Sequence, residues 1–136
     1  MHMVTRTIAR HTVLIVDDEP GVLDVWSRIL LDEGYRVARA CDAFDAVGML
    51  ASNRPTVAIC DLHLPGPSGV WLAKMIRQHC PRTAVVLASG DPAGTHDEPL
   101  RETVVACVTK PLCRDQLLAA VRIGIGWASE QTTTLN

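Results

Sequence analysis

The chain lacks three features that mark common classes of protein. Its 136 residues contain no apolar run near the roughly 20 residues that cross a bilayer, and no signal-peptide pattern opens the sequence. No basic run is present, and 13 Lys and Arg residues stand against 15 Asp and Glu, a formal net charge of -2. Nucleic-acid-binding domains are usually strongly basic. We therefore expect a cytoplasmic protein with no membrane span and no nucleic-acid partner.

The five cysteines lack the spacing of a structural framework. Their number is odd and no C-x-x-C pair occurs, so neither a set of disulfides nor a zinc site is indicated. Cys60 and Cys107 lie inside apolar runs, which predicts that both are small core residues. The length suits a single domain with a real core.

Short apolar runs are what the chain does contain, and they predict five strands. Four of the runs are continuous, as in strands that are buried on both faces of a sheet. A fifth run alternates polar with apolar residues, which is typical of an edge strand. The continuous runs span 12–16, 56–60, 84–88 and 104–108, and the alternating run spans 35–40.

Helical patterns of apolar residues separate these runs. Asp18 or Glu19 can cap the first helix, Pro20 suits its first position and Gly34 the position after its end. This helix is therefore predicted over 20–33. Further helices are predicted over 42–53, from 68 or 69 to 79, and from 114 to about 128. Gly124 and Gly126 weaken the last helix by roughly 1 kcal/mol each relative to Ala. Residues 90–103 predict a loop with one or two helical turns, and the polar residues 131–136 a disordered tail.

Alternating strands and helices predict an α/β fold with a doubly wound, five-stranded parallel sheet between two helical layers. The expected strand order is 2-1-3-4-5, as in flavodoxin-like proteins. We place the domain at residues 12–126, after a flexible segment over 1–11 and before a C-terminal tail over 127–136.

Polar residues follow four of the predicted strands. They are Asp17, Asp18, Asp61, Ser89 and Lys110. In an open parallel sheet the carboxyl ends of the strands meet at one crevice, so these residues can gather there despite their separation in sequence. Three carboxylates without His or Cys ligands suit Mg²⁺, which prefers oxygen ligands.

The same residues are suited to phosphoryl transfer. A carboxylate that attacks phosphorus forms an aspartyl-phosphate, and the main difficulty of the reaction is the charge on the transferring oxygens. The Lys110 ammonium can neutralise one oxygen, Mg²⁺ a second, and the Ser89 hydroxyl can donate to the third. The alternative is a purely structural role for each residue. For example, Asp17 or Asp18 could simply cap the following helix.

Four motifs together resemble the receiver domains of response regulators, over roughly residues 12–126. The motifs are Val16-Asp17-Asp18-Glu19, Asp61-Leu62-His63-Leu64-Pro65-Gly66 with Ser68-Gly69, Ala88-Ser89-Gly90, and Thr109-Lys110-Pro111. The resemblance implies two-component signalling or a phosphorelay, in which a sensor histidine kinase or a histidine phosphotransfer protein is the phosphoryl donor. A downstream protein target of unknown identity would read the result.

The resemblance also implies residue roles at the metal and at the phosphoryl group. Asp61 is the implied phosphoacceptor and a ligand of Mg²⁺. Asp18 would bind the metal directly, Asp17 mostly through water, and the backbone carbonyl of His63 would be a further ligand. Such a domain catalyses only its own phosphorylation and dephosphorylation.

The remaining implied roles concern the signal. Ser89 would follow the phosphoryl group as a switch residue, Lys110 would pair with it, and the Lys110-Pro111 peptide bond would be cis. The family often has an aromatic residue where this chain has Cys107. The aromatic half of the usual switch is therefore missing.

Two other classes of protein use related features. A small Mg²⁺-dependent aspartyl-phosphate phosphatase usually has a second acid two residues after its nucleophile, where this chain has His63. A flavin-binding protein with the same strand order needs a phosphate-binding loop after the first strand, where Asp17 and Asp18 would repel a phosphate. His63 in place of the second acid, and Asp17 and Asp18 in place of the phosphate-binding loop, both favour the receiver interpretation.

Overall fold

The computed structural model describes residues 11–91 and 102–135. The predicted flexible segment over 1–11 and the predicted loop over 90–103 lie mostly outside these ranges. Among the described residues, no helix is both long and apolar enough to span a membrane.

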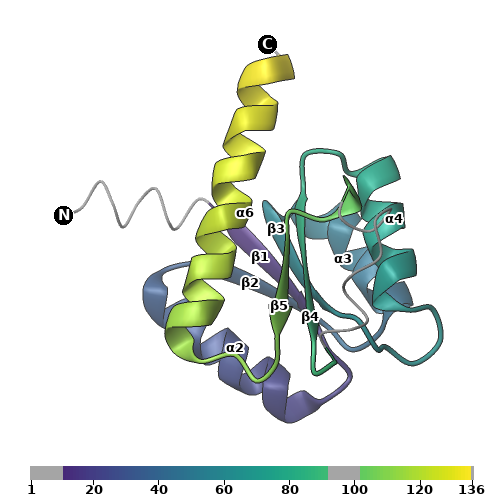
Figure 1. Ribbon diagram of the computed structural model, residues 1–136, viewed down its shortest axis with the longest axis vertical. Coiled ribbons are helices and arrows are strands. Elements are labelled where there is room, and N and C mark those ends of the chain that lie inside the picture. Colours follow the sequence, from purple (N-terminus) through teal and green to yellow (C-terminus); the bar gives the residue numbers. More distant parts are fainter. Residues whose placement is uncertain (1–10, 92–101, 136) are drawn as a thin grey trace.

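A parallel sheet of five strands forms the centre of the molecule (Figure 1). Its strands lie in the order β2-β1-β3-β4-β5, and every neighbouring pair is parallel. The predicted doubly wound fold is therefore confirmed. The strand bounds are β1 Thr12–Val16, β2 Arg36–Ala40, β3 Val57–Asp61, β4 Ala84–Ser89 and β5 Ala106–Thr109.

Within residues 11–91 and 102–135, two helices cover each face of the sheet. Residues of α3 and α4 share one apolar cluster with the sheet, and residues of α2 and α6 share the other. Successive residues of β1 point to opposite faces, so Leu14 belongs to the first cluster and Ile15 to the second. The helix bounds are α2 Pro20–Glu33, α3 Ala43–Asn53, α4 Gly69–His79 and α6 Arg114–Leu135.

The predicted signals at the helix ends are present. Pro20 begins α2, and Gly34 ends it with φ of 104° in the left-handed region that favours glycine. The Asp42 and Ser68 side chains accept hydrogen bonds from the backbone N–H groups of Asp45 and Trp71, and so cap α3 and α4.

The last strand differs from its prediction, because it begins at Ala106 rather than at residue 104. It lies at the edge of the sheet and pairs only with β4, so its residues alternate between partly buried and exposed. The prediction that Cys107 is a core residue was therefore wrong, since its side chain is exposed. The same prediction for Cys60 is confirmed: the thiol is buried, which raises its pKa to about 12.

The last helix is longer than predicted. It continues through Leu135, so the expected end near residue 128 and the expected disorder of residues 131–135 were both wrong. Gly124 stabilises the packing of α6, because a Cβ there would lie 2.7 Å from the Val57 side chain. One turn later the Arg77 guanidinium lies 5.1 Å from the centre of the Trp127 ring. These contacts outweigh the low helix propensity of the glycines.

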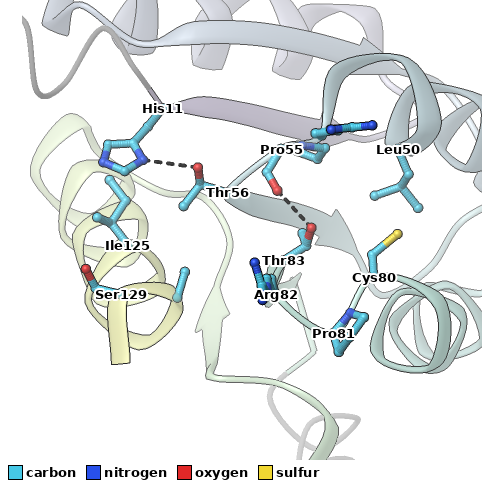
Figure 2. A pocket seen from close by; sticks show the side chains of 12 residues that line it. His11, Leu50, Pro55, Thr56, Cys80, Pro81, Arg82, Thr83, Ile125 and Ser129 are labelled. Carbon is cyan, nitrogen blue, oxygen red and sulfur yellow. Dashed lines mark hydrogen bonds between the residues drawn. The ribbon is translucent and has the colours of Figure 1, made fainter. Parts of the chain in front are cut away.

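A cleft of about 710 Å³ lies at the amino end of the sheet (Figure 2). Polar groups in its wall bond to one another. His11 Nδ1 and Thr56 Oγ1 are 3.1 Å apart, and the Thr83 hydroxyl donates to the Pro55 carbonyl oxygen over 2.8 Å. Burial lowers the pKa of His11.

Candidate functional site

The carboxyl end of the sheet brings the predicted polar residues to one edge. Asp17 and Asp18 directly follow β1, Asp61 is the last residue of β3, and Lys110 directly follows β5. One carboxylate oxygen of each aspartate lies within 4.8 Å of the other two. Lys110 Nζ lies 2.6 Å from Asp17 Oδ2 and 3.5 Å from Asp61 Oδ2. The predicted gathering of these four side chains is confirmed.

The three carboxylates differ in exposure. Asp17 is fully buried and Asp61 is nearly so, with 7 % of its surface exposed, whereas Asp18 faces solvent. Glu19, not Asp17 or Asp18, occupies the cap position of α2, and the Asp17 carboxylate accepts the Glu19 N–H over 2.9 Å. The capping interpretation of the two aspartates is therefore wrong.

Burial dominates the electrostatics of Asp61. It raises the pKa of the carboxyl, while the His63 backbone N–H, donated over 3.2 Å, and the Lys110 ammonium partly oppose this effect. Asp17 adds to the increase by repulsion between like charges. A cation at this site would therefore favour the ionised Asp61 that nucleophilic attack requires.

Lys110 is held as a cation in the middle of the acidic group. Burial alone would lower its pKa, but the hydrogen bond and attraction of Asp17, together with attraction from Asp61 and Glu19, outweigh burial and raise it. Its side chain is 18 % exposed. The ammonium thus has a fixed, partly desolvated position beside both buried carboxylates.

Ser89 ends β4 and is fully buried. In the register of the sheet Asp61 pairs with Ala88, so Ser89 lies one residue beyond Asp61 along the neighbouring strand. Its hydroxyl bonds to the backbone of Asp91, which it contacts at both N–H and carbonyl over 3.0 Å. The Lys110 N–H donates to the Ser89 carbonyl over 2.8 Å, which links the two strand ends.

The backbone around the site has two special features. A Cβ at Gly69 would overlap the carbonyl oxygen of Asp61, so only glycine allows α4 to begin this close to β3. The Lys110-Pro111 peptide bond is cis, as the family resemblance implied. The close approach at Gly69 was not predicted from the sequence.

An open cleft of about 740 Å³ gives access to the site. Asp18, Asp61 and Lys110 line one part of it, and Val22, Val25 and Trp26 of α2 line another. The Trp26 ring is buried, and its centroid lies 5.9 Å from Lys110 Nζ. This contact between α2 and the residue after β5 was not predicted from the sequence.

The arrangement fits a hard divalent cation. Three carboxylates face a single ammonium, and oxygen is the ligand atom that Mg²⁺ prefers. An anionic group beside Asp61 would be attracted by both the metal and Lys110, which is the requirement of phosphoryl transfer.

The family model described as "Response regulator receiver domain" matches residues 13–122. The chain belongs to this family. It is a receiver domain of a two-component response regulator. Within the curated relatives, the nitrogen assimilation regulatory protein NtrX of Azorhizobium caulinodans is 39% identical over 82 residues, which cover 59% of this chain and 18% of that protein. The receiver therefore spans only a small part of the length of that relative.

Solved structures agree with the family and the fold. The signal receiver domain of an HD domain-containing protein from Pseudomonas fluorescens Pf-5 is 28% identical, with a TM-score of 0.78, over 88% of this chain and 98% of that one. The response regulator TrrA from Thermotoga maritima, in complex with Mg²⁺-BeF, is 24% identical, with a TM-score of 0.77. That alignment covers 84% of this chain and 98% of TrrA. At this identity TrrA supports the fold alone.

Proposed function

We propose that this receiver accepts a phosphoryl group on Asp61, in the presence of Mg²⁺, from a sensor histidine kinase or a histidine phosphotransfer protein. One observation carries the proposal: the buried Asp61 carboxylate lies 3.5 Å from the Lys110 ammonium and within 4.8 Å of two further carboxylates. A nucleophile, a fixed cation and a set of metal ligands thus share one cleft. The domain acts on its own aspartyl-phosphate and is not otherwise an enzyme.

Asp61, Asp18 and the His63 backbone carbonyl would hold the metal directly, and Asp17 mostly through water. When bound, Mg²⁺ supplies positive charge to the phosphoryl oxygens. The Asp61 oxygen attacks phosphorus, an O–P bond forms, and the P–N bond to the donor imidazole breaks. The leaving imidazole nitrogen keeps the electron pair of that bond and is then protonated.

Lys110 and Ser89 change partners in this scheme. Lys110 leaves Asp17, now 2.6 Å away, and pairs with a phosphoryl oxygen. The Ser89 hydroxyl leaves the Asp91 carbonyl, which it now contacts over 3.0 Å, and donates to another phosphoryl oxygen. The phosphorylated state would thus release a bond to the segment after β4, and a downstream protein target would read this change.

The walls of the cleft favour a donor that is carried by a protein. Val25 is 57 % exposed, and Val22 and Leu112 also line the cleft. Such an apolar rim around a charged centre suits contact with a helix that presents a phosphorylated histidine. The protein would meet this donor in the cytoplasm.

The phosphatase alternative requires an acid two residues after Asp61. His63 occupies that position with an exposed side chain, and no observation in the described residues favours the alternative.

Phosphorylation by acetyl phosphate with Mg²⁺, followed by intact mass spectrometry, tests the proposal. The wild-type protein should gain one phosphoryl group, and the Asp61→Asn variant none. Asp32→Asn removes an exposed carboxylate of α2 away from the site and should be labelled like wild type. A chelator should prevent labelling. Equal labelling of wild type and Asp61→Asn would refute the proposal.

A further inference from the structure

Lys110 has an aromatic neighbour that the phosphoryl chemistry does not require. The ammonium lies 5.9 Å from the centroid of the Trp26 ring, within the distance over which a ring face attracts a cation. Trp26 is only 3 % exposed and belongs to the apolar cluster between α2 and the sheet. Its position is therefore set by packing, and the ring is a rigid surface next to a flexible side chain.

The other charged groups that interact with the Lys110 ammonium, among the described residues, are carboxylates. Asp17 lies at 2.6 Å and Asp61 at 3.5 Å, and the exposed Glu19 also attracts the ammonium. Asp17 and Asp61 are also ligand candidates for a metal ion. Any cation that binds them weakens their attraction for Lys110, whereas the attraction of Glu19 is left intact.

We propose that Trp26 is a positioning residue that keeps the Lys110 ammonium inside the cleft while its carboxylate partners are taken by Mg²⁺ and by the phosphoryl group. This inference rests on the proposed function of Asp61. The ring face neither binds Mg²⁺ nor accepts a phosphoryl group, so its attraction persists through the exchange of partners. It limits the freedom of the four-carbon lysine stem while the ammonium changes its charged partners.

Two substitutions of Trp26 separate this role from simple packing. Trp26→Phe keeps an aromatic face, and Trp26→Leu keeps an apolar side chain without one. With acetyl phosphate and Mg²⁺, Trp26→Leu should be phosphorylated about three- to tenfold more slowly than wild type, and Trp26→Phe within about twofold. Both variants should keep wild-type circular dichroism. Equal rates for all three proteins, or equal losses in both variants, would overturn the inference.

A spectroscopic measurement tests the contact itself and needs no phosphoryl donor. In a Trp71→Phe, Trp127→Phe background the emission comes from Trp26 alone. Lys110→Met should shift the emission maximum, because a cation near the indole changes its excited-state energy. Lys74→Met removes the other lysine of the chain, which is exposed on α4, and should leave the emission unchanged. Identical spectra for the background protein and its Lys110→Met variant would overturn the inference.

The two proposals fail in different ways. If wild type and Asp61→Asn are labelled equally, the proposed function fails. If only wild type is labelled and Trp26→Leu reacts as fast as wild type, the role of Trp26 fails and the function of Asp61 stands.

Discussion

The two ends of the sheet are built from the same strands but hold different kinds of polar group. At the amino end Thr83 donates to the Pro55 carbonyl and His11 bonds to Thr56, so neutral groups satisfy one another (Figure 2). At the carboxyl end three carboxylates face one ammonium. The hydrogen-bonded pairs at the amino end are neutral and lie beside two cationic side chains of the cleft, Arg54 and Arg82. The three carboxylates and one ammonium at the carboxyl end instead carry an excess of negative charge.

The contrast shows where stability and function lie in this fold. Paired neutral groups contribute to stability and leave no chemistry to perform. Carboxylates held close together repel one another and destabilise the folded state, and a bound metal ion reduces this repulsion. Such locally unfavourable arrangements are typical of functional sites. Substitutions at the amino end should therefore change stability alone, and substitutions at the carboxyl end should change both stability and phosphorylation.

The largest effect is expected for Lys110→Met. This substitution leaves the fully buried Asp17 carboxylate without its cation. Without Mg²⁺ the free energy of unfolding should therefore fall by about 2–4 kcal/mol. This is slightly less than for a fully buried pair, because the Lys110 side chain is 18 % exposed. Urea denaturation measures the loss. Mg²⁺ should make this loss of stability smaller, because the charge of the metal then compensates the Asp17 carboxylate. Unchanged stability in metal-free buffer would show that the negative charge of Asp17 is compensated without Lys110.

A smaller effect is expected at the opposite end. Thr83→Val removes the hydroxyl that donates to the Pro55 carbonyl over 2.8 Å and leaves that oxygen without its donor, at a cost of about 1–2 kcal/mol. Acetyl phosphate should label the variant at the wild-type rate. A large change in that rate would mean that the two ends are coupled and would break the comparison.

The smallest effect concerns pH. Burial raises the pKa of Asp61 above its ordinary 3.8, so the native state retains a proton that the unfolded state has lost. Wild-type stability should therefore fall as the pH rises from 3.8 through the raised pKa, and Asp61→Asn should lack this fall. In metal-free buffer the variant should therefore be more stable than wild type at pH 7, and no more stable than wild type below pH 3.8. Parallel stability curves for the two proteins would contradict the assigned burial effect.

Much of the site could be predicted from the sequence because parallel strands impose it. Once Asp17, Asp61 and Lys110 each follow an apolar run, the common direction of the strands brings them to one edge. The same logic failed for Cys107, because an apolar run does not tell whether its strand is central or at an edge. It also failed for the end of α6, because the helix continues past Gly124, whose lack of a side chain lets it pack against Val57.

By itself the sequence determined which strands and helices form and which residues stand at the strand ends. Those features depend on local patterns of apolar and polar residues. Only the tertiary structure decided that Asp17 is fully buried against Lys110, that the Ser89 hydroxyl bonds to Asp91, and that the Trp26 ring lies beside the ammonium. Those contacts join residues of different elements, so their distances depend on how α2, β4 and β5 pack together, which no local pattern specifies.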